Sequence, residues 1–174
     1  MTLPSQWRKG LKQSIYMSKS LAYIGIDPGK SGALCLLVPE TKRIEFIKTT
    51  EKPMDIYSWL SDIDYLTPIQ VIMLEKVHAI QGTSAGSNFS FGFNTGLVNG
   101  LAGTVGCSVD HVTPKTWQKY IGVTKQGKAI KKEVGEIVTR LYPKAEIHGP
   151  RGGLLDGRAD ALCIAHFASH KWRI

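Results

Sequence analysis

Four acidic residues stand where their carboxylates could act together. Asp27 follows the apolar run 22–26 and Glu75 follows the apolar run 71–74, so each acid ends a segment that predicts a central strand. Asp156 and Asp160 are four residues apart in a segment with helical periodicity, which puts both on one helix face. Acids held close together need a cation or a raised pKa, because like charges repel.

Asp27, Glu75, Asp156 and Asp160 would form an oxygen-rich site of the kind that Mg²⁺ and Mn²⁺ prefer. Two such ions about 4 Å apart can activate a water molecule, neutralise a phosphodiester and stabilise the leaving oxygen. The sequence therefore predicts a site for two Mg²⁺ ions, with Mn²⁺ as a substitute, and phosphodiester hydrolysis as its chemistry.

The same acids also have structural interpretations. Asp27 precedes Pro28 and Gly29, and an aspartate often caps such a turn through its side chain. Asp156 could be the N-cap of its helix, and Asp160 a first-turn acid favoured by the helix dipole. Capping accounts poorly for Asp160, which shares the apolar stripe of its helix, because a buried carboxylate is costly without a partner.

A nucleotide-binding loop is the first alternative for the segment after Asp27. Gly29-Lys30-Ser31 copies the end of a Walker A motif, but its spacing from Gly25 is one residue short and an apolar strand follows in place of a helix. The segment does not match the Gly-x-Gly-x-x-Gly motif of dinucleotide-binding proteins either. We therefore expect no nucleotide cofactor.

The elements that must position these acids alternate between strands and helices. Hydrophobic periodicity and turn residues predict strands at 21–27, 31–38, 43–49, 69–75 and 108–112, and helices at 53–66, from 114, at 128–141 and at 156–170. The glycine-rich segment 81–106 permits a further helix, whose length its glycines limit. This order predicts an α/β fold with one mixed five-stranded sheet flanked by helices, in which the first three strands are antiparallel and helical crossovers reach the others.

The net charge of +8 is unevenly distributed. Residues 115–158 contain ten basic and four acidic residues, and residues 1–20 contain four basic and none acidic. Such a distribution indicates an anionic partner. Nucleic acid is the leading candidate for this partner, and an anionic membrane surface is the second. A solvated, lysine-rich surface explains the charge equally well.

Length and composition favour one compact domain over residues 21–174, with residues 1–20 as a basic, flexible N-terminal extension and Met17 as a candidate internal start. Three scattered cysteines without zinc spacing favour a reducing compartment. The longest apolar run, 33–38, is far shorter than the roughly 20 residues of a membrane span, so we expect no membrane partner. The cytoplasm of a bacterium or of a phage-infected host is the predicted location, with an organelle as the alternative.

Several motifs occur together in one order along the chain. They are Ile24-Gly25-Ile26-Asp27-Pro28-Gly29, Leu74-Glu75, Pro114-Lys115-Thr116-Trp117 and Asp156-Gly157-Arg158-Ala159-Asp160-Ala161-Leu162. This set resembles the RuvC family of Holliday junction resolvases over residues 21 to 170. Because the last two acids are four apart, it is more similar to phage-type and chloroplast-type members than to the bacterial enzyme, in which they are three apart.

The resemblance implies an RNase H-like fold, a homodimer and Mg²⁺-dependent paired nicking of four-way DNA, with catalytic roles for the four acids. It also implies DNA contacts. Bacterial members of the family have an aromatic residue three positions after the strand-ending glutamate, where this chain has His78. The predicted DNA-binding residues are His78, Phe89, Phe91, Lys115, Lys125, Lys128, Lys131, Lys132 and Arg158. For the phenylalanines a core or dimer-interface role is an equal alternative.

The leading functional hypothesis is a structure-selective DNA endonuclease that resolves Holliday junctions and other branched DNA. An actin-like or sugar-kinase-like ATPase fragment is one alternative, although such proteins need two lobes and 174 residues supply one. A junction-binding protein without activity is another. Four acids facing DNA oppose it, since they would repel the phosphates unless a metal neutralised them.

Overall fold

The computed structural model describes residues 20–76, 82 and 84–173. Its centre is a five-stranded mixed sheet, and the predicted α/β fold class is confirmed. The strands are β1 (Ala22–Asp27), β2 (Ala33–Val38), β3 (Arg43–Lys48), β4 (Ile69–Glu75) and β5 (Ser108–Val112). The helices are α2 (Pro53–Leu66), α3 (Ala85–Gly103), α4 (Pro114–Ile121), α5 (Ala129–Leu141) and α6 (Asp156–Lys171).

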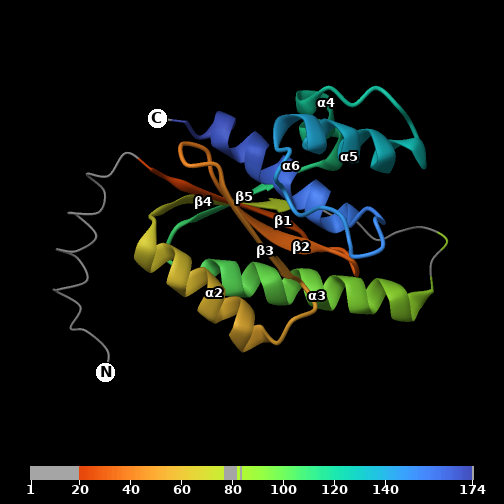
Figure 1. Ribbon diagram of the computed structural model, residues 1–174. Coiled ribbons are helices and arrows are strands. Elements are labelled where there is room, and N and C mark those ends of the chain that lie inside the picture. Colours follow the sequence, from red (N-terminus) through yellow and green to blue (C-terminus); the bar gives the residue numbers. More distant parts are fainter. Residues whose placement is uncertain (1–19, 77–81, 83, 174) are drawn as a thin grey trace, which may run out of the picture.

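The strand order is β3-β2-β1-β4-β5. β1, β2 and β3 form the predicted antiparallel meander. β4 and β5 run parallel to β1 because helices α2 and α3 provide the crossovers. Figure 1 shows α2 and α3 on one face of the sheet and α4, α5 and α6 on the other.

Two hydrophobic cores lie on the two faces of the sheet, because alternate residues of each strand point to opposite sides. Tyr23 and Cys35 face the core that contains α6, whereas Ile24 and Leu36 face the core that contains α2. All four side chains are at most 3% exposed. β1 and β2 are therefore covered on both faces, which explains their continuous apolar sequences.

Some element ends differ from the sequence prediction for local reasons. β2 begins at Ala33 and not at 31, because the Gly32 amide donates a 2.8 Å hydrogen bond to the Gly29 carbonyl in the preceding turn. α3 begins after Ser84, whose hydroxyl accepts from the Ser87 amide at 3.2 Å. This cap starts the helix despite its many glycines.

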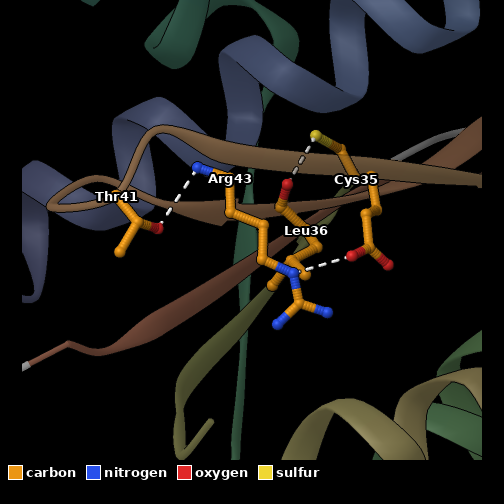
Figure 2. A network of polar contacts seen from close by, with 5 residues as sticks. Cys35, Leu36, Thr41 and Arg43 are labelled. Atoms are coloured by element: carbon orange, nitrogen blue, oxygen red, sulfur yellow. Dashed lines mark hydrogen bonds and ion pairs between the residues drawn. The ribbon is translucent and has the colours of Figure 1, made fainter. Parts of the chain in front are cut away.

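The edge strand β3 is only partly buried along its length. Figure 2 shows the polar contacts beside it: the Arg43 amide donates to the Thr41 hydroxyl at 3.3 Å, and its guanidinium Nε donates to a carboxylate. That carboxylate is Glu45 Oε1, at 2.7 Å. Charged side chains on an edge strand disfavour pairing with the sheet of another molecule.

The predictions made for residues 1–19 and for His78 lie outside the described residues. Within the described part of the chain, no helix combines the length and the apolar character that crossing a membrane requires.

Candidate active site

Two of the four acids are placed by the pairing of β1 with β4. These strands are parallel, with Ile26 opposite Leu74, so Asp27 and Glu75 follow side by side. Adjacent strands are roughly 4.8 Å apart, and alternation puts both carboxylates on the sheet face that α6 covers. The expected neighbourhood of Asp27 and Glu75 is therefore present in the structure.

The other two acids come from α6, which crosses β1 at very short range. A Cβ atom at Gly25 would overlap the carbonyl oxygen of Ala161 and the amide nitrogen of Ala165. A Cβ atom at Gly157 would overlap the backbone of Ser31 in the turn that follows β1. Two glycines thus let the first turns of α6 approach the strand end that holds Asp27.

Electrostatics shows that the four acids share one region. Burial raises the pKa of Asp160 to about 8, and repulsion by Asp27, Glu75 and Asp156 adds to the rise. The pKa of Asp27 is raised by burial and by Asp156, whereas the Gly29 amide opposes this rise. Every acid of the set therefore acts on at least one other.

Asp27 has a structural contact as well. Its Oδ1 accepts a 2.9 Å hydrogen bond from the Gly29 amide, which is the turn-capping interaction that the sequence suggested. A carboxylate has a second oxygen with its own lone pairs, so capping does not prevent Asp27 from binding a cation.

Glu75 is held by a residue whose role the sequence did not reveal. Trp117, on α4 and 1% exposed, donates a 2.7 Å hydrogen bond from Nε1 to Glu75 Oε1. Burial raises the pKa of Glu75 to about 7, the indole N–H opposes this, and Asp27 adds to the rise. The Pro-Lys-Thr-Trp motif was the available signal, but only the tertiary structure shows which acid the indole reaches.

A lysine also enters the acidic region. Lys131 on α5 donates from Nζ to Oδ2 of Asp156 at the start of α6. Its pKa is raised, first by this hydrogen bond and then by the charges of Asp156, Asp160 and Asp27. A cation from the protein itself therefore lies beside three of the four acids.

The carboxylates converge without forming a closed ligand shell. Among the described residues, no three His, Cys, Asp or Glu side chains are arranged as a ready metal-binding group. The donor set nevertheless fits Mg²⁺ or Mn²⁺, because it consists of carboxylate oxygens, and repulsion among these carboxylates adds to the rise in pKa that burial causes at Asp160 and Glu75.

The predicted basic residues divide into two groups. Lys128, Lys131 and Lys132 line a hollow of about 690 Å³ on α5, together with Arg140 and His148, which the sequence analysis did not place at the site. Lys115 is exposed on α4, and Lys125 lies in the exposed segment before α5. The hollow thus gathers four cationic side chains, with His148 and the acidic Glu136, around the Lys131–Asp156 pair.

Arg158 makes contacts within the protein. Its guanidinium lies 5.2 Å from the Phe46 ring centroid and donates a 2.9 Å hydrogen bond to the Glu146 carbonyl. These contacts connect α6 to β3 and to the segment between α5 and α6. The predicted DNA contact of Arg158 stays a prediction.

The predicted aromatic contacts lie on the other side of the sheet. Phe89 is 75% exposed and Phe91 is partly buried on α3. The N-terminal end of this helix extends beyond the sheet in Figure 1. Both side chains are thus available to another molecule.

The strand order and the helices on both faces define an α/β protein with a mixed five-stranded sheet. Two solved structures similar to this chain are RuvC from Thermus thermophilus. The one in complex with a Holliday junction substrate has a TM-score of 0.57 and 19% identity, over 87% of this chain and 96% of that chain. The structure described simply as Thermus thermophilus RuvC has a TM-score of 0.53 and 19% identity, over 88% and 97%.

The yeast mitochondrial Holliday junction resolvase is a third similar structure, with a TM-score of 0.46 and 14% identity, over 95% of this chain and 84% of that chain. No protein-family model matches the chain. No curated protein sequence matches it either. The Thermus structures confirm the RuvC-like fold that the resemblance implied, and at 19% identity they establish the fold alone.

Proposed function

We propose that this protein is a metal-dependent endonuclease that cuts four-way DNA junctions. The observation that carries the proposal is the convergence of Asp27, Glu75, Asp156 and Asp160 from two adjacent strand ends and one helix. The similar Thermus thermophilus RuvC is a protein whose structure contains a Holliday junction substrate, which supports branched DNA as the substrate here.

The four acids would hold two Mg²⁺ ions, with Mn²⁺ as a substitute. When bound, these ions supply a Lewis acid that activates water and neutralises charge on the phosphodiester. Asp27 and Glu75 provide oxygens from the rigid sheet, and Trp117 fixes the orientation of the Glu75 carboxylate through its 2.7 Å hydrogen bond. The short approach of α6 to β1 holds Asp156 and Asp160 opposite them.

The basic hollow on α5 would bind the DNA backbone. Lys128, Lys132 and Arg140 line it, and their charges attract phosphates without reading the base sequence. Lys131 joins this hollow to the acidic region. A strand held there would therefore pass close to the carboxylates.

Paired cutting of a junction requires two active sites, so we propose a homodimer. α3 supports this, because Phe89 and Phe93 are 75% and 62% exposed and lie one helical turn apart. Large exposed apolar side chains on one helix are typical of an interaction surface. Sedimentation of the wild type and of Phe93→Ser would test the dimer, which we expect the substitution to weaken.

Cleavage of matched DNA substrates tests the proposed function. We would incubate the purified protein with a four-way junction, a linear duplex and an RNA/DNA hybrid, with Mg²⁺ or with EDTA. We expect symmetric nicks in the junction, only with Mg²⁺, that are absent for Asp160→Asn. Cleavage of the hybrid alone, or junction binding without cutting under every condition, would contradict the proposal.

A further inference from the structure

Lys131 differs from the other lysines of α5 in what it contacts. Its ammonium group donates to Asp156 and also lies in the field of Asp160 and Asp27. Lys132, the next residue, is 3.9 Å from Glu136 Oε1 on its own helix, with a side chain that is 81% exposed. One lysine is therefore directed at the acidic region, and its neighbour is directed along the helix surface.

The contact of Lys131 is built so that it can open. Its side chain is 67% exposed and that of Asp156 is 29% exposed, so solvent reaches the pair. Ion pairs with such exposed partners are weak. A divalent cation interacts more strongly with carboxylates than an ammonium does, because it has twice the charge and several coordination positions.

The Lys131 side chain also borders a second site in which it could bind a phosphate. It lines the basic hollow with Lys128, Lys132 and Arg140, where these cations outnumber the one acidic lining residue, Glu136, and would attract a phosphate. The ammonium cannot pair with Asp156 and bind a phosphate at full strength in the same position. Binding of a cation at the carboxylates and binding of DNA in the hollow are thus connected through one side chain.

We propose that Lys131 is a displaceable counter-cation, which neutralises the acidic region in the metal-free protein and is released to the DNA backbone when a divalent cation binds. The first half depends only on the carboxylates and on Lys131. The second half rests on the proposed function, since it requires DNA in the hollow. In this role Lys131 is a positioning residue and not a catalytic one.

Titration of the metal-free protein with Mn²⁺, in the absence of DNA, tests the first half. Lys131→Gln removes the competing ammonium, so we expect it to bind Mn²⁺ about two- to fivefold more tightly than the wild type. Lys132→Gln removes the same charge from the next position and is the matched control, with an expected change below about twofold. Equal affinities for the two variants, or weaker binding by Lys131→Gln, would overturn the proposal.

Thermal unfolding in EDTA gives a second readout that needs no activity. Without its counter-cation the acidic region repels itself, so Lys131→Gln should unfold at a lower temperature than Lys132→Gln, and saturating Mn²⁺ should remove the difference. A difference that persists in Mn²⁺ would show a purely structural role for Lys131 and would contradict the proposal.

The salt dependence of junction binding tests the second half. For the wild type, we expect Ca²⁺ to steepen the slope of log affinity against log salt concentration, relative to EDTA, by the release of about one more ion, because a lysine becomes available to a phosphate. For Lys131→Gln, Ca²⁺ should leave this slope unchanged. Equal slopes in Ca²⁺ and EDTA for the wild type would exclude the release of Lys131 to DNA. A protein that binds no junction contradicts the proposed function, and the Mn²⁺ titration then still decides whether Lys131 is displaced.

Discussion

The indole Nε1 of Trp117 donates a 2.7 Å hydrogen bond to Oε1 of Glu75, which joins α4 to the end of β4. Trp117 is 1% exposed, so water has little access to replace this bond. Because the donor stabilises the ionised carboxylate, it lowers the pKa of Glu75, which burial and Asp27 otherwise raise. Trp117 therefore favours the ionised form of Glu75.

We predict that Trp117→Phe slows junction cleavage about 10- to 100-fold, because it removes the group that orients and ionises Glu75. Loss of the donor raises the pKa of Glu75 further, so the acidic limb of the rate profile should move to higher pH. Single-turnover cleavage between about pH 6 and 9 measures both effects.

Trp172→Phe is the matched control for this substitution. The Trp172 indole donates to Asp110 Oδ2 at 3.3 Å, at the other end of α6 from the acidic region. We expect its rate profile to match that of the wild type. An unshifted profile for Trp117→Phe would exclude the proposed role of the indole.

Asp160 should make the metal-free protein less stable at high pH. Its pKa rises from 3.8 to about 8 on folding, so its contribution to stability is complete below about pH 4 and is lost as the pH rises to about 8. Asp160→Asn removes the buried charge. We expect it to increase the free energy of unfolding in EDTA by about 1–2 kcal/mol at high pH and to change it little in acid, as measured by urea denaturation.

Asp110→Asn should have the opposite effect and lower the free energy of unfolding. The hydrogen bond from Lys171, at 2.7 Å, lowers the pKa of Asp110, so its contribution is present above the unfolded pKa and is lost as the pH falls. Because both partners are partly exposed, the expected loss at neutral pH is about 0.5 kcal/mol. Destabilisation by both variants at high pH would contradict the raised pKa of Asp160.

The close contact between β1 and α6 predicts a strong effect of Gly25→Ala. The added methyl group would meet backbone atoms of Ala161 and Ala165, which cannot move as a side chain does. We expect a loss of about 2–3 kcal/mol in urea denaturation. Gly100→Ala, on α3 with open space around its Cβ position, should instead be neutral or stabilise by up to about 1 kcal/mol. Similar results for both glycines would argue against the close contact.

Lys128 should contribute to DNA affinity through the backbone. We predict that Lys128→Ala weakens junction binding uniformly across base sequences and reduces its salt slope by about one ion. Lys42→Ala is the control, because Lys42 lies in the turn between β2 and β3, at the opposite end of the sheet from Asp27. A wild-type slope for Lys128→Ala would remove this residue from the predicted contacts.

Most of the fold was predictable because the sequence has clear local patterns. The bounds of β4, β5 and α2 match the prediction; a proline lies at the start of α2 and directly before β4, and Glu75 ends the apolar run of β4. The proximity of Asp27 to Glu75 was also predictable, because both end neighbouring strands of one sheet. α3 was harder, since only Val98 and Ala102 are buried and its periodicity is correspondingly weak.

Contacts between elements far apart in the chain were not predictable. Trp117 is 42 residues from Glu75, and its helical periodicity indicated only a buried side. Lys131 had the signature of a solvated helix face, and its contact with Asp156 depends on how α5 lies against the start of α6. Arg158 likewise reaches Phe46 only because β3 and α6 come together.

The most direct test of the metal-dependent acidic site is single-turnover cleavage of a four-way junction by the wild type and by Asp27→Asn, with Mg²⁺ or with EDTA. Asp27→Asn keeps the side-chain oxygen that accepts from Gly29 but loses the charge that would hold the metal. We predict paired nicks by the wild type in Mg²⁺ only, and a rate for Asp27→Asn at least about 10³-fold lower. Cleavage by Asp27→Asn at the wild-type rate, or cleavage by the wild type in EDTA, would contradict a metal-dependent active site at these acids.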